Sequence, residues 1–161
     1  MSKYTQFLQE EQFRLLNKLE MDTQAQWGVM TAQHMVEHLG SLYVFTLEKT
    51  KLKAFFSPEK LLRNYQYLIQ KKQPFYTNIR LPGLEKPLAL RYAKLDDSIT
   101  ALKSLVDAFY AFFKDDLSKK TLHPAAGLLQ FSEWEYIHYA HSHHHLYQFN
   151  LSQDSSFTKH R

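Results

Sequence analysis

The segment from Lys94 to about Leu117 places the strongest constraint on the fold of this chain. Its apolar residues recur at the three- and four-residue spacing of one broad helix face: Leu95, Ile99, Leu102, Leu105, Val106, Phe109, Phe112 and Phe113. A helix with such a stripe must bury it against other elements of the fold. The sequence therefore predicts a long core helix with helical partners.

Weaker patterns predict those partners over residues 4–19, 32–48, 58–72 and 132–149. Thr31 is a good N-cap for the second of them, and Pro58 suits the first turn of the third, which we interpret as an accessory helix. Ser132 and Glu135 have the spacing of a capping box at the start of the last helix.

The longest irregular connection is expected over residues 73–92, where three prolines and a glycine interrupt regular structure. The helices and this connection together predict an all-α fold, an up-and-down four-helix bundle with a long crossover connection. A chain of 161 residues fits one domain, so we expect residues 1–161 to form a single domain. Residues 150–161 are expected to be a flexible C-terminal tail.

Composition excludes several classes of site. The chain has no cysteine, which excludes disulfides, thiolate zinc sites and a cysteine nucleophile, so any metal needs nitrogen or oxygen ligands. No apolar run approaches the roughly 20 residues of a membrane span, which predicts a cytoplasmic protein without a membrane partner. The net charge of +4 owes much to the basic segment Lys49–Lys72, for which a solvated helix face is favoured over nucleic-acid binding.

The stretch EYIHYAHSHHHLYQF holds five of the nine histidines. His141 and His145 are four residues apart, so they share a helix face, which is also the apolar side. His143 is predicted to face solvent on the opposite side. His138 and His144 fall at the margins of the inner face, where they are candidates for contacts to the ligands, for interface residues or for exposed residues.

A metal site would need a third ligand, because two histidines rarely suffice for zinc or nickel. The segment TAQHMVEHL offers His34 and His38, and helical register places His38 beside the apolar stripe and His34 farther round. The pattern alone supports a metal triad and buried, hydrogen-bonded histidines about equally.

Two segments carry a resemblance to a known family. Trp27–Leu39 (WGVMTAQHMVEHL) and His123–Phe149 (HPAAGLLQFSEWEYIHYAHSHHHLYQF) resemble a branch of the DinB/YfiT-like superfamily that is described mainly as of unknown function. The resemblance implies the four-helix bundle and a divalent metal ion, usually zinc or nickel, held by His38, His141 and His145.

Members of that superfamily include thiol-dependent S-transferases, a mycothiol-dependent isomerase and proteins described as metal-dependent hydrolases. The resemblance therefore predicts a metal-dependent enzyme that activates water or a small-molecule thiol, acting on an unknown small-molecule substrate. The alternative is a non-catalytic metal-containing module that binds a ligand or acts in a stress response. Where relatives commonly carry a basic residue shortly after a ligand, this chain has Tyr147, which speaks against an anionic substrate or a thiol cofactor held by that residue.

Some residues stay unassigned. The candidates for a general base are Glu37, Tyr43, Glu135 and His144, and no spacing singles one out. His123, Pro124 and Gly127 are interpreted as shaping the turn into the last helix. The tyrosines that could cover a partner in a homodimer are Tyr136, Tyr139 and Tyr147, but the sequence leaves the oligomeric state open.

Overall fold

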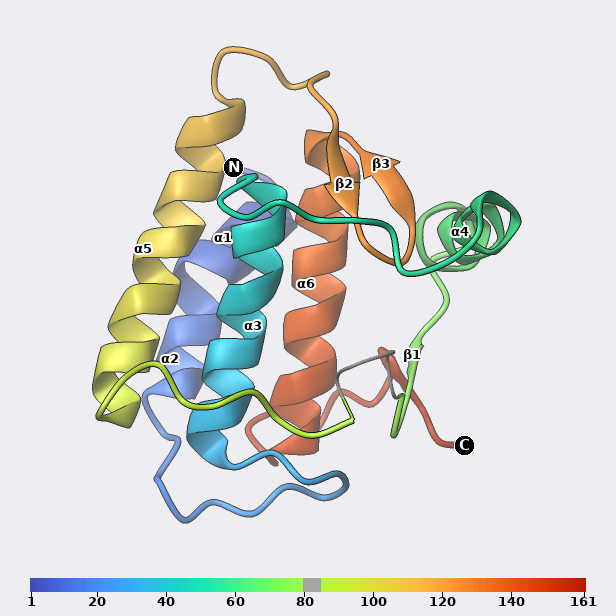
Figure 1. The fold of residues 1–161 in the computed structure, drawn as a ribbon. Coiled ribbons are helices and arrows are strands. Elements are labelled where there is room, and N and C mark those ends of the chain that lie inside the picture. The colour runs from blue at the N-terminus through green and yellow to red at the C-terminus, as the bar shows by residue number, and fades with distance from the viewer. Residues whose placement is uncertain (80–84) are drawn as a thin grey trace.

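The structure of the protein is a computed structural model that describes residues 1–79 and 85–161. Residues 80–84, which belong to the expected irregular connection, lie outside the described residues. Helices lie side by side along most of the molecule, and α3 contacts both α5 and α6 (Figure 1). The bounds of these helical elements are α1 (Lys3–Gln6), the π-helical turn η1 (Phe7–Glu11), α2 (Gln12–Leu16), α3 (Ala32–Thr46), α5 (Leu95–Phe113) and α6 (Phe131–Gln148).

Two of the predicted helix starts are confirmed. The Thr31 hydroxyl accepts the backbone N–H of His34 at 3.2 Å and so caps α3. Ser57 caps α4 (Pro58–Tyr65) with Pro58 in its first turn, and the helix continues as η2 (Gln66–Gln70).

The predicted capping box of the last helix is wrong by two residues. Helix α6 begins at Phe131, and the Glu133 carboxylate accepts the backbone N–H of Gln130 at 2.9 Å. The carboxylate of Glu135 instead accepts the hydroxyls of Thr5 at 2.6 Å and Tyr110 at 2.9 Å. Glu135 therefore ties the N-terminal helix and α5 to α6 rather than capping its own helix.

The expected all-α four-helix bundle is wrong, because the structure also contains two small sheets of two strands. In one of them β2 (Thr121–His123) and β3 (Gly127–Leu129) pair in an antiparallel hairpin. Gly127 adopts φ +83°, a conformation that a residue with a side chain rarely takes, and this allows the tight return of the chain. The sequence predicts only a turn at His123, Pro124 and Gly127, because strands of three residues are too short to show an alternating pattern.

The other sheet joins segments that are far apart in sequence. Strand β1 (Phe75–Tyr76) pairs in parallel with β4 (Thr158–Lys159), and the backbone N–H of Thr77 donates to the carbonyl of Lys159 at 2.9 Å. Strand β4 lies in the segment 150–161 for which we predicted flexibility. Its flexibility stays a prediction, whereas the pairing gives the segment a defined partner beside α6 (Figure 1).

The core lies between the helices and is rich in aromatic side chains. Trp134, Tyr43, Phe109 and Phe113 are all fully buried, together with aliphatic residues of α3, α5 and α6. The stripe that defined the long core helix supplies Leu102, Val106, Phe109 and Phe113 to this core. In the described part of the chain, none of the helices is both long and apolar enough to cross a membrane.

Candidate metal centre

The candidate ligands come from two neighbouring helices, α3 and α6. His38 lies in α3, between the buried residues Met35 and Leu39 of its inner side. His141 and His145 lie one turn apart on α6, as predicted from their spacing. The capping contact of Thr31 fixes the start of α3, so the position of His38 follows from a local signal in the sequence.

The imidazoles of these three histidines converge. The Nε2 atom of His141 lies 3.0 Å from Nε2 of His38 and 3.0 Å from Nε2 of His145. One ring nitrogen of each residue lies within 4.8 Å of those of the other two. The structure therefore brings together all three residues that the sequence nominated.

Exposure is graded across the site, since His145 is buried, His141 is half-buried and His38 is exposed. Burial lowers the pKa of His145 well below its ordinary value, and the neighbouring imidazoles of His38 and His144 lower it further. Burial, followed by the neighbouring His145 and His38, also lowers the pKa of His141. Both rings are therefore neutral near pH 7, which is the form that binds a metal ion.

The donor set fits a divalent ion such as zinc or nickel. In tetrahedral zinc sites with Zn–N bonds of about 2.0–2.1 Å, two ligand nitrogens lie roughly 3.3 Å apart, close to the two 3.0 Å separations from His141. The Nδ1 atom of His145 lies 2.7 Å from Oε1 of Gln148, an oxygen that can only accept. His145 therefore carries its proton on Nδ1, and its Nε2 lone pair points to the other two rings.

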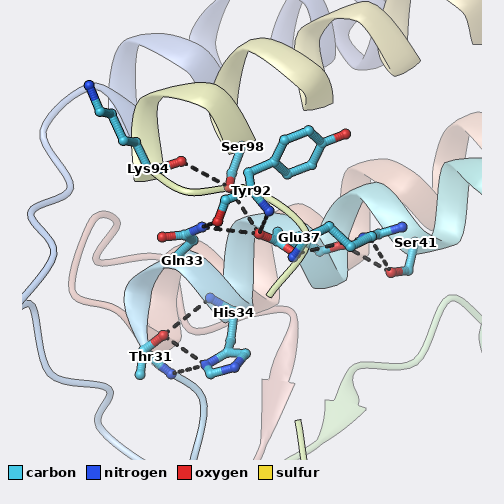
Figure 2. A network of polar contacts seen from close by, with 9 residues as sticks. Thr31, Gln33, His34, Glu37, Ser41, Tyr92, Lys94 and Ser98 are labelled. Atoms are coloured by element: carbon cyan, nitrogen blue, oxygen red, sulfur yellow. Dashed lines mark hydrogen bonds and ion pairs between the residues drawn. The ribbon is translucent and has the colours of Figure 1, made fainter. Parts of the chain in front are cut away.

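His34, the competing candidate on α3, has a structural contact instead. Its Nδ1 atom accepts the backbone N–H of Thr31 at 3.4 Å, and this contact completes the cap of α3 (Figure 2). The preference for His38 over His34 as the residue near the pair on α6 therefore agrees with the structure.

The prediction that His143 faces solvent is wrong. Its ring stacks between Phe7, at 4.1 Å between ring centroids, and Phe157, at 4.7 Å. The η1 turn and the C-terminal segment cover this side of α6, so the helix has buried residues on opposite faces. A single-face interpretation of α6 could not anticipate that covering.

His138 and His144 are also buried rather than marginal. His138 stacks on Tyr43 with 3.6 Å between centroids, and its Nε2 atom lies 3.0 Å from the Thr46 hydroxyl, which gives it a packing role. His144 lies beside His145, and its Nδ1 atom lies 2.8 Å from the hydroxyl of Thr158 in β4. The C-terminal strand is thereby attached next to the candidate ligands.

The side chain of Glu37 contacts other residues than that of its neighbour His38, although both lie on α3. Its carboxylate accepts the backbone N–H of Arg91 at 2.8 Å, the amide of Gln33 at 3.1 Å and the hydroxyl of Ser98 at 3.2 Å (Figure 2). Burial raises the pKa of Glu37, but these hydrogen bonds outweigh it and the pKa lies below its ordinary value. Glu37 therefore joins the 91–92 loop to α3 and α5 and is not placed as a general base.

The surroundings of the candidate ligands are aromatic. The Phe75 ring of β1 lies 5.8 Å from the ring of His141, and Trp27 lies 5.5 Å from the ring of His144. A cavity of about 440 Å³ lies elsewhere, between α3 and α5, with Glu37 and Arg91 in its lining. None of the three candidate ligands is among the described residues that line this cavity, so it is separate from the candidate metal centre.

Two features proposed from the sequence as surfaces are partly occupied within the chain. Tyr136 is buried and packs edge-on against Tyr4, and the Lys72 ammonium lies 4.7 Å from its ring centre. The Lys60 ammonium similarly lies 3.9 Å from the ring centre of Phe56. Tyr136, Lys72 and Lys60 therefore each contact an aromatic ring of the same chain.

In the comparisons with known proteins, one family model matches residues 76–152 of the chain. No curated protein and no solved structure matches the chain. The matched segment contains His141 and His145 but not His38, and it does not test the resemblance to the DinB/YfiT-like superfamily. What the comparison establishes is that residues 76–152 of this chain match the family described as "Protein of unknown function (DUF1569)".

Proposed function

We propose that this protein is a metal-dependent enzyme whose divalent ion, zinc or nickel, is held by His38, His141 and His145. The observation that carries the proposal is the convergence of their Nε2 atoms, with 3.0 Å separations from His141 to each of the other two. The substrate class is a small molecule, and the reaction is either hydrolysis or the transfer of a small-molecule thiol.

An ion held by three neutral imidazoles supplies Lewis acidity that makes a water or thiol easier to deprotonate near neutral pH. The part of the chain is to present neutral nitrogen ligands and to leave a side open to solvent, which the exposure of His38 provides. The chain has no cysteine, so the sulfur nucleophile of a transfer reaction would have to come from a thiol cosubstrate.

Hydrolysis is the better supported of the two reactions. Where a basic residue could hold an anionic thiol, the chain has Tyr147, whose ring packs 5.8 Å from that of Trp27. A phenol in that place offers no fixed positive charge to a carboxylate or phosphate.

A non-catalytic metal-containing module, for ligand binding or a stress response, is the alternative. It is favoured by the packing of Phe75 against His141, because β1 then covers part of the candidate centre and restricts access. We also propose that the chain is a member of the DinB/YfiT-like superfamily, on the ground of the two motifs that contain the candidate ligands. A cytoplasmic location and a homodimer are further parts of the proposal.

Turnover by tag-free protein loaded with zinc or nickel tests the proposal. Ester and phosphoester substrates report hydrolysis, and a small thiol with an electrophile reports transfer. The rate should fall by about 100-fold or more in His38→Ala, because this substitution removes a ligand of the ion. The rate should stay at the wild-type level in His34→Ala. An anomalous scattering map that shows a fourth protein ligand on the ion, leaving no open position, would instead support the non-catalytic module.

A further inference from the structure

Gln148 joins a candidate ligand to a distant turn of the chain. It is 2 % exposed, and its Oε1 atom lies 2.7 Å from Nδ1 of His145. At the other end of the same amide, Nε2 donates to the backbone carbonyl of Trp27 at 2.8 Å. A carbonyl only accepts, so this contact determines which end of the amide faces the imidazole.

The turn at Trp27 is built to receive this amide. Gly28 adopts φ +83°, and a Cβ atom there would lie 3.2 Å from Nε2 of Gln148. A side chain at this position would therefore be strained and would press on the amide. The backbone N–H of Gln26 also donates to the carbonyl of Gln148 at 2.8 Å, so the turn is attached to the end of α6 at two points of one residue.

We propose that Gln148 is a positioning residue of the metal centre, held in place by the turn at Trp27 and Gly28. It keeps the proton of His145 on Nδ1 and so directs the lone pair of Nε2 toward the other two ligands. Groups of this kind fix the tautomer and orientation of a ligating histidine and raise its basicity. The inference rests on the proposed metal site, and it gives one physical reason for two motifs, Trp-Gly and Gln-Phe, that lie over a hundred residues apart.

Substitution of Gln148 tests this role through metal affinity. In Gln148→Leu the Nδ1–H loses its acceptor, so the dissociation constant for zinc, measured by competition with a chelator, should rise about 10- to 100-fold. Gln148→Glu keeps an acceptor for Nδ1–H and should bind zinc more tightly than Gln148→Leu. An unchanged zinc affinity in Gln148→Leu would overturn the proposal.

Gln12→Leu is a matched control. Gln12 is also buried and its Oε1 atom accepts the hydroxyl of Ser142 of α6 at 3.1 Å, but it makes no hydrogen bond to a candidate ligand. Its substitution removes a buried amide beside the same helix, so it reports the general cost of that change. The control should leave zinc affinity within about 3-fold of wild type, since it makes no ligand-orienting bond.

The tautomer of His145 gives a second readout that needs no variant and no metal. In full-length protein treated with a chelator, the ¹⁵N chemical shifts of His145 should report protonated Nδ1 and unprotonated Nε2. Protonated Nε2 would overturn the positioning role even if zinc binds. If the wild type binds no zinc but His145 shows the Nδ1–H tautomer, the metal proposal fails while the orienting contact stands.

Gly28→Ala tests the turn separately from the amide. The added Cβ should displace Gln148 and raise the zinc dissociation constant in the same direction as Gln148→Leu. In the double variant with Gln148→Leu, the alanine should cause little further loss, because the amide that it displaces is already absent. Full additivity of the two effects would show that the turn does not act through Gln148.

Discussion

His38 and His141 are 103 positions apart in the chain, yet their Nε2 atoms lie 3.0 Å apart. The contact joins α3 to α6, and His145 adds a second residue of α6 to it. Anything that binds all three nitrogens therefore binds the folded arrangement of two helices and not the unfolded chain. Metal binding and folding stability should consequently be coupled.

The coupling predicts that zinc raises the melting temperature of the wild-type protein. Free zinc at about 100 times its dissociation constant would add roughly 2.7 kcal/mol to the free energy of unfolding. Differential scanning calorimetry of chelator-treated protein, with and without zinc, measures the shift. His38→Ala should abolish it and His34→Ala should keep it; an equal shift in His38→Ala would place the zinc elsewhere.

Acid should destabilise the protein through its buried histidines, of which His123 lies in β2, outside the two helices that carry the candidate ligands. Burial lowers the pKa of His123 to about 4. Because the unfolded chain, with a pKa near 6.5, takes up the proton first, the contribution of His123 is complete above about pH 6.5 and is lost as pH falls toward 4. Between about pH 7.5 and pH 5 this residue alone should lower the free energy of unfolding by about 2 kcal/mol.

Urea denaturation at those two pH values measures the change, and His123→Asn isolates the residue. The Nδ1 atom of His123 accepts the backbone N–H of Ala125 at 3.1 Å, a contact that an asparagine oxygen can replace without a titrating group. The variant should show a smaller loss of stability on acidification than the wild type. Identical losses in the two proteins would show that His123 is not neutral and buried in solution.

Glu37 should matter for stability and not for metal content. In Glu37→Ala the backbone N–H of Arg91 and the hydroxyl of Ser98 lose their acceptor, which should lower the free energy of unfolding by about 2–4 kcal/mol. The exposed Glu20→Ala is the control, with an expected change within about 0.5 kcal/mol. A Glu37→Ala protein that folds with wild-type stability but loses its metal would instead assign Glu37 to the centre.

The C-terminal segment allows a direct test of its predicted flexibility. The backbone N–H groups of Phe75 and Thr77 donate to the carbonyls of Phe157 and Lys159, so hydrogen exchange at both amides should be slowed. Phe157→Ala removes the ring that stacks on His143 and should speed exchange at both. Exchange at the unfolded-chain rate in the wild type would mean that the segment is as flexible as its sequence suggested.

Helical register was enough to predict which histidines lie close together, whereas their role as ligands was implied by the family resemblance. Apolar residues on α3 and α6 report which side of each helix faces inward, and that side carries His38, His141 and His145. The same reasoning failed for His143, because the C-terminal segment and η1 cover a second side of α6. When distant parts of the chain cover a side of a helix, the sequence of that helix need not show a periodic apolar pattern on the covered side.

The two small sheets were not predicted, because their strands are short and one of the pairings joins distant parts of the chain. Strand β1 has two residues, and its partner β4 lies at the other end of the chain, so no local alternation marks the pairing. The proposed role of Gln148 likewise could not be predicted, although the residue follows His145 by only three positions on α6. Its meaning depends on the carbonyl of Trp27, a backbone atom that no sequence motif specifies.

Metal content of tag-free protein, measured by inductively coupled plasma mass spectrometry after gentle repletion and desalting, tests the proposed centre most directly. The proposal predicts about one zinc or nickel ion per wild-type chain, as expected for a single three-histidine site, and its loss in each of His38→Ala, His141→Ala and His145→Ala. The matched variant His34→Ala should retain the ion. Wild-type protein without a stoichiometric ion, or triad variants that keep it, would contradict the proposed metal centre.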